Sequence, residues 1–168
     1  VLEWFPHEGI LFHGARLQSR TRIELAGSAR FVGWDIISLG RPVIGERFDA
    51  GRADLALMIL RDGRPLLSER LRLSTASDLD GPSGLRGQPI CATFVASGAS
   101  NDDLAAARAH LRTPEGLAFA MSLVADVLVA RALAGGVEAI HRIFAALWGI
   151  LRHRLLGRES CAPRIWAT

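Results

Sequence analysis

The chain has 168 residues, 49% of them hydrophobic, which is enough to bury the core of one domain and excludes a disordered chain. All 20 basic residues are arginine, so a P-loop nucleotide site and Schiff-base chemistry are excluded, because both need a lysine amine. The 17 acidic residues are interleaved with the arginines and leave a net charge of only +3, which disfavours nucleic-acid binding.

The first half of the chain predicts strands. From Leu2 to Leu73, short apolar or alternating runs are punctuated by Gly, Pro and Asp. We expect strands at about 10–13, 20–26, 30–38, 54–61 and 65–72. The last two are joined by Asp62-Gly63-Arg64, whose Asp-Gly pair supplies the positive φ that a tight hairpin turn needs. Residues 74–88, rich in Ser, Gly, Asp and Pro, predict a surface loop.

The second half adds two helices. A strand is expected over Ile90–Ser97, followed by a helix from Asn101 to about Arg112, because Asn and Asp side chains cap free amides at a helix start. Residues 117–124 and 127–133 fit strand or helix by periodicity, and their β-branched content favours strands. Apolar residues then recur at helical spacing from Val137 to Leu156. The chain therefore predicts a single, mainly β domain over residues 1–168, with two α-helices towards the carboxyl end.

The cysteines and the most apolar segment exclude further classes. Cys91 and Cys161 are far apart and form no Cys-x-x-Cys pair, so neither a disulfide framework nor a zinc ribbon is indicated. Reduced thiols predict a cytoplasmic protein. Residues 117–134 are interrupted by Asp126 and Arg131, and we therefore expect no membrane span.

Enzymatic signatures are missing from the sequence. It contains no His-Glu-x-x-His, no Gly-x-Ser-x-Gly and no glycine-rich turn between a strand and a helix. A Ser-His-Asp triad needs no fixed spacing and stays open, but nothing in the sequence favours one. We expect a binding protein and not an enzyme.

Two segments do not follow from any amphipathic pattern. One runs through Gly33-Trp34-Asp35, Gly40-Arg41-Pro42 and Gly45-Glu46-Arg47-Phe48, and the other is the terminal Pro163-Arg164-Ile165-Trp166. Together with Trp4-Phe5-Pro6-His7-Glu8 upstream, they resemble the UreD family of urease accessory proteins, also called UreH. The resemblance covers nearly the whole chain. Because family members carry a further segment ahead of such a start, we expect this chain to be the carboxyl-terminal part of a longer protein.

The resemblance implies a fold and a function. The fold would be a β-helix-like stack of strands with two helices near the carboxyl end. The protein would be a scaffold, without catalysis of its own, that is required for nickel insertion into apo-urease. It would act with UreF and, through UreF, with the GTPase UreG, as a dimer of heterodimers with UreF. Nickel would bind only transiently, with no tightly bound cofactor and with neither nucleic acid nor a membrane as partner.

Candidates for the path of the metal fall into two groups. His7, Glu8 and His13 flank a predicted strand, and imidazole and carboxylate groups suit weak, exchangeable nickel coordination. The resemblance implies a second group: Asp35, Arg41 and Glu46 would line a polar interior along which the metal passes. The alternative for the second group is structural, with Arg41 and Glu46 pairing across a turn.

The terminal motif supplies the candidates for partner binding, namely Arg164, Ile165 and Trp166. An exposed Trp-Arg end suits a hot spot for a protein partner, whereas a buried one would only anchor the carboxyl terminus. Two other functions stay open: a mainly β interaction module unrelated to metals, and a fragment of a hydrolase or transferase.

Overall fold

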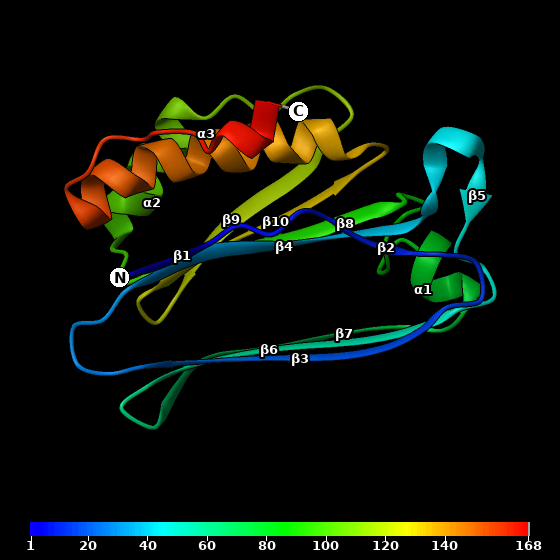
Figure 1. Cartoon of the computed structure of the whole chain (residues 1–168), viewed down its shortest axis with the longest axis horizontal. Coiled ribbons are helices and arrows are strands. Elements are labelled where there is room, and N and C mark those ends of the chain that lie inside the picture. The colour runs from blue at the N-terminus through cyan, green and yellow to red at the C-terminus, as the bar shows by residue number, and fades with distance from the viewer. Residues whose placement is uncertain (168) are drawn as a thin grey trace.

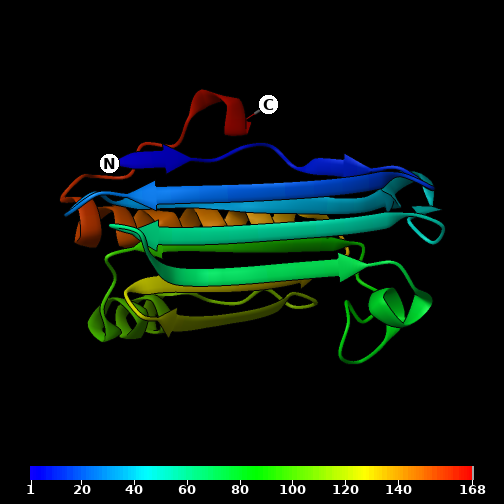
Figure 2. The same ribbon diagram turned by 90° about the horizontal axis from the view of Figure 1, so that it is seen from below.

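The computed structural model describes residues 1–167, and of Ile165 and Ala167 the backbone only. Two β-sheets face each other, and two long helices cover the outer face of the larger sheet (Figure 1). The strands of the small sheet run along those of the large one in the view from below (Figure 2). The molecule therefore has three layers: small sheet, large sheet and helices.

The large sheet has the strand order β1-β4-β8-β10-β9, with β2 and β5 also paired to β4. Its strands are β1 (Leu2–Trp4), β2 (Gly9–Leu11), β4 (Phe31–Arg41), β5 (Glu46–Arg47), β8 (Ile90–Ser97), β9 (Ala118–Val124) and β10 (Val127–Ala134). The small sheet has the order β3-β6-β7, formed by β3 (Arg16–Leu25), β6 (Arg52–Arg61) and β7 (Arg64–Leu73).

The chain alternates between the two sheets from β2 to β6. As a result β1 and β2 pair in parallel with β4, and β3 pairs in parallel with β6 along its whole length. The remaining strands are added by antiparallel pairing. This arrangement is a stack of strands, and the predicted mainly β class with helices towards the carboxyl end is confirmed.

The helices are α1 (Ala76–Asp80), α2 (Asn101–His110) and α3 (Val137–Leu156), and the 3₁₀ turns are η1 (Pro42–Ile44) and η2 (Arg164–Ala167). Ser100 caps α2 through a reciprocal capping box with Asp103. Burial alone would raise the pKa of Asp103, but hydrogen bonds from Ser100 and Arg154 outweigh it and lower that pKa. Arg154 belongs to α3, so the same carboxylate starts α2 and ties it to α3. No helix in residues 1–167 has the length and apolar character needed to cross a membrane.

Several predicted boundaries were wrong. The strand at 10–13 is β2, one residue earlier, and β3 begins at Arg16 and not at about residue 20. The strands β1 and β5 were missed because they are only two or three residues long. Helix α1 lies inside the predicted loop at 74–88, although its capping box between Thr75 and Asp78 is readable in the sequence.

Apolar side chains fill three regions. The largest lies between α3 and the outer face of the large sheet, where Ile140, Phe144 and Leu147 pack over Trp34 and Phe94. Two smaller clusters lie between the sheets. The α1-end cluster contains Leu11, Ile37, Leu39, Phe48, Ala53, Leu73, Leu85 and Cys91. The opposite cluster, here the Arg61-end cluster, contains Leu25, Phe31, Ile59, Leu67, Val95, Val127 and Val129.

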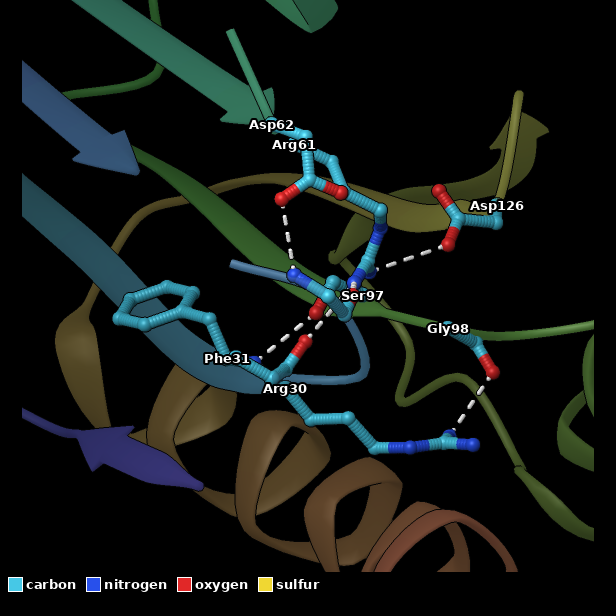
Figure 3. A network of polar contacts seen from close by, with 9 residues as sticks. Arg30, Phe31, Arg61, Asp62, Ser97, Gly98 and Asp126 are labelled. Atoms are coloured by element: carbon cyan, nitrogen blue, oxygen red, sulfur yellow. Dashed lines mark hydrogen bonds and ion pairs between the residues drawn. The ribbon is translucent and has the colours of Figure 1, made fainter. Parts of the chain in front are cut away.

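An arginine network joins the sheets beside the Arg61-end cluster (Figure 3). Arg61, at the end of β6, donates to the carbonyl oxygens of Gly27 and Ala29, at 2.5 and 3.0 Å, and to Asp126 Oδ2 at 3.2 Å. Gly27 in turn donates its N–H to Asp62 Oδ1 at 2.9 Å. One guanidinium therefore connects the small sheet to the β3–β4 loop and to the β9–β10 turn.

Gly40 is the residue that allows the β4–β5 hairpin to form. Its φ is +85°, and a Cβ atom there would clash with the backbone carbonyl of Glu46. Gly14 also has positive φ, at +71°, but faces open space. We expect Gly40→Ala to lower the free energy of unfolding by about 2 to 4 kcal/mol, and Gly14→Ala by only about 1 kcal/mol from its backbone conformation. Urea denaturation of both variants measures the difference, and equal losses would contradict this account of Gly40.

Candidate functional site: a polar row between the two sheets

A row of polar side chains crosses the large sheet on the face that looks towards the small one. Within Phe31–Gly40 of β4, all described, Asp35 alone is exposed. In β8 and β10, whose residues are likewise all described, Thr93 is the single residue that is not buried and Arg131 the single exposed one. The register pairs Asp35 with Thr93 and Thr93 with Arg131. We call Asp35, Thr93 and Arg131 the polar row.

The small sheet presents its own side chains opposite the polar row. There the register places Thr21 beside Leu57, and Leu57 beside Glu69. Glu69 on β7 forms an ion pair with Arg131 on β10, so one charged contact spans the space between the sheets. These residues line a cavity of about 960 Å³. The polar row therefore lies in an open cavity and not in a closed core.

The cavity passes between the two inter-sheet clusters. The α1-end cluster supplies Ile37 and Cys91, with Leu133 packed against it, to one side of the row, and the Arg61-end cluster supplies Val95 to the other. Because strand side chains alternate, these residues are the next inward-facing positions before and after the row. The space between the sheets is thus apolar at both ends and polar across the middle. We call this middle part the polar passage.

Asp35 is the acidic group of the large sheet in the passage. Partial burial raises its pKa, against a smaller lowering from the backbone N–H of Ile36. Burial is the main cause that raises the pKa of the Cys91 thiol to about 12, and the neighbouring Asp35 carboxylate contributes to the rise. In the metal-free chain Cys91 is therefore a protonated thiol near neutral pH. The other donors in the passage are carboxylate and hydroxyl oxygens, which bind divalent cations weakly and exchangeably.

Three of the predicted metal-path residues meet at the β4–β5 hairpin. Glu46 accepts hydrogen bonds from the Arg41 side chain and from the backbone N–H of His13, the latter at 3.2 Å. His13 Nδ1 lies 2.9 Å from Asp49 Oδ1. The hydrogen bond from Arg41 is the main cause that lowers the pKa of Glu46. Arg41 and Glu46 pair across the turn and lie outside the residues that line the polar passage.

The other two predicted metal-path residues of the amino-terminal segment lie near α3. Glu8 Oε2 is 3.5 Å from His141 Nε2, and His7 is exposed. Among residues 1–167, no three His, Cys, Asp or Glu side chains are grouped closely enough to hold a metal ion. Of the six candidates, the structure places only Asp35 in the passage.

The terminal residues Arg164 and Trp166 lie on the helical side of the molecule. The Trp166 ring packs on Trp34, Trp148 and Phe5, with centroid distances of 5.0, 5.3 and 5.6 Å. Arg164 is exposed, and the side chain of Ile165 lies outside the described part of the chain. Trp166 thus anchors the terminus on the segment that carries Asp35, and its role in partner binding stays a prediction.

Sequence reasoning missed the rest of the passage: Thr93, Arg131, Glu69 and Thr21. It also missed a set of exposed apolar side chains near the hairpin. Val43 and Ile44 in η1 are 97% and 66% exposed, and Phe12, whose ring lies 5.0 Å from the Arg41 guanidinium, is 52% exposed. The sequence contains a signal for these exposed side chains, since Pro42-Val43-Ile44-Gly45 places two apolar residues inside a turn.

Comparison with known proteins decides the family. The family model described as UreD urease accessory protein matches residues 1–167. The chain belongs to the UreD family of urease accessory proteins. It is 43% identical to the urease accessory protein UreD of Alcanivorax borkumensis, 46% to that of Pseudomonas aeruginosa and 43% to that of Nitrosococcus oceani. Each match covers 100% of this chain and 57 to 60% of the relative.

The chain therefore spans about three fifths of the length of these UreD relatives. The relatives are named as accessory proteins and not as enzymes, in agreement with the missing enzymatic signatures. Both segments on which the resemblance depended, around Trp34 and Trp166, lie in contact in the structure.

The raised pKa of Asp35 has a consequence for stability. Because the fold disfavours the charged carboxylate, ionised Asp35 destabilises the native state, and this cost is absent below its unfolded pKa of about 3.9. We expect Asp35→Asn to raise the melting temperature at pH 7 and to leave it nearly unchanged at about pH 3. Thermal unfolding followed by circular dichroism at both pH values measures this. A lower melting temperature at pH 7 would show that Asp35 is stabilised by its surroundings.

Proposed function

We propose that this UreD-family chain takes part in nickel insertion into urease, and that the polar passage carries the metal ion between its partners. The observation that supports this most directly is the polar row, because Asp35, Thr93 and Arg131 are open to water within strands that are otherwise almost entirely buried. A core designed only for stability would fill these positions with apolar side chains. The row therefore has a use other than holding the sheets together.

The donor chemistry of the passage fits transit better than storage. Asp35 and Glu69 are on different sheets, and the hydroxyl groups of Thr21 and Thr93 are weak ligands. Such oxygens let a cation exchange rapidly. A delivery protein must release its ion to the next partner, so a chelating cluster would work against it.

The partners that we propose are apo-urease, UreF and, through UreF, UreG. Nucleotide chemistry would belong to UreG, because this chain has no lysine for a P-loop. For the contact with UreF we favour the exposed apolar side chains of Val43 and Ile44, which we call the knob, in addition to the terminal residues Arg164, Ile165 and Trp166. Exposed apolar side chains of this kind suit burial in a partner's interface.

The metal role is tested by a pair of charge-neutralising variants. Asp35→Asn removes the carboxylate from the passage, whereas Asp54→Asn removes an equal charge from the outer face of β6, where Asp54 binds Arg70. In the full-length protein, co-expressed with urease and the other accessory proteins, we expect Asp35→Asn to lower the nickel content of urease at least about tenfold. Asp54→Asn should stay near wild type. Normal nickel content with Asp35→Asn would contradict the proposed passage.

Partner binding is tested at the knob. We expect the double variant Val43→Ser with Ile44→Ser to lose most of its binding to UreF in a pull-down, because both side chains would be buried in the complex. Its melting temperature should not fall, since neither side chain is buried in the chain itself. Val124→Ser, 39% exposed on β9, is the matched control. Undiminished UreF binding by the double variant would remove the knob from the interface.

A further inference from the structure

Arg131 is an unexpected residue for a passage that carries cations. Its side chain is 52% exposed and bonds to Glu69, whose side chain is 21% exposed. A guanidinium remains charged at every physiological pH, so Arg131 is a permanent positive charge at this point. Its only acidic contact among the described residues is Glu69.

The register gives Arg131 a defined place relative to Asp35. The two residues lie on β10 and β4, with β8 between them. Two strand spacings amount to about 10 Å, so Arg131 and Asp35 occupy separate positions across the sheet. Without Arg131, Glu69 would have no ion-pair partner among the described residues.

We propose that Arg131 is a built-in competitor for metal cations, which occupies Glu69 and keeps the polar passage from binding a divalent ion tightly. The inference rests on the proposed function, because it concerns how the same passage handles its ion. A divalent cation that reaches Glu69 must displace the guanidinium, and the guanidinium displaces the cation in return. Arg131 suits such exchange because it is the more exposed partner and its flexible side chain can turn towards solvent.

The test measures nickel binding to the full-length protein by equilibrium dialysis with NiCl₂, independently of urease. Arg131→Gln should tighten binding in the passage about tenfold, from the electrostatic gain of a divalent ion near an unpaired carboxylate. Arg131→Lys, which keeps the charge, should stay within about twofold of wild type. The double variant Arg131→Gln with Glu69→Gln should return to wild-type affinity, because the freed carboxylate is gone.

The matched control is Arg22→Gln, which frees Glu24 in an exposed ion pair on the outer face of β3. Unchanged affinity in Arg131→Gln, or equal tightening in Arg22→Gln, would overturn the competitor role, as would tightening that persists in the double variant. These outcomes are distinct from failure of the proposed function. If Asp35→Asn impairs urease maturation while Arg131→Gln binds nickel as wild type does, the passage stands and only the competitor role is lost.

Discussion

The ion pair between Arg131 and Glu69 determines how the two sheets can pack. Charged groups between sheets are costly unless they are paired or hydrated, and this contact meets both conditions because its two side chains pair and remain partly exposed. The cavity around the polar row leaves room for water beside them. The sheets are instead held together on either side, by the α1-end and the Arg61-end clusters. Because the two apolar clusters hold the sheets at both ends, the polar middle can stay open as a passage.

Contacts at the two ends of the space between the sheets hold the sheets together, because the polar middle contributes few apolar contacts. Arg61 joins the small sheet to Gly27, Ala29 and Asp126 at one end, and Phe48 and Leu85 pack into the α1-end cluster at the other. Backbone carbonyls that accept from a guanidinium make stronger hydrogen bonds than neutral pairs do. These contacts offset the cost of Asp35 in the passage, where burial disfavours its charge and raises its pKa.

The sequence predicts the elements of this fold better than the site. Regular apolar spacing was enough for β4, for the hairpin of β6 and β7, and for α3, where local signals agree with the final structure. The polar row depends on register between strands that are distant in the chain, and register is set by packing of the whole sheet. Arg131 in particular lies in a segment whose periodicity fitted strand and helix alike. Asp35 was found because of the motif around it, and its partners had no such marker.

The alternation of side chains along β4 explains why that motif matters. Gly33 and Asp35 point towards the small sheet, and a Cβ at Gly33 would come within 2.6 Å of the Trp4 carbonyl oxygen. Trp34, between them, points to the helical side, donates to the Pro6 carbonyl at 3.0 Å and packs on Trp166. One tripeptide thus presents a carboxylate to the passage on one face and an aromatic anchor for the carboxyl terminus on the other. The terminal segment therefore restrains the strand on which Asp35 lies, which couples the outer aromatic cluster physically to the interior of the passage.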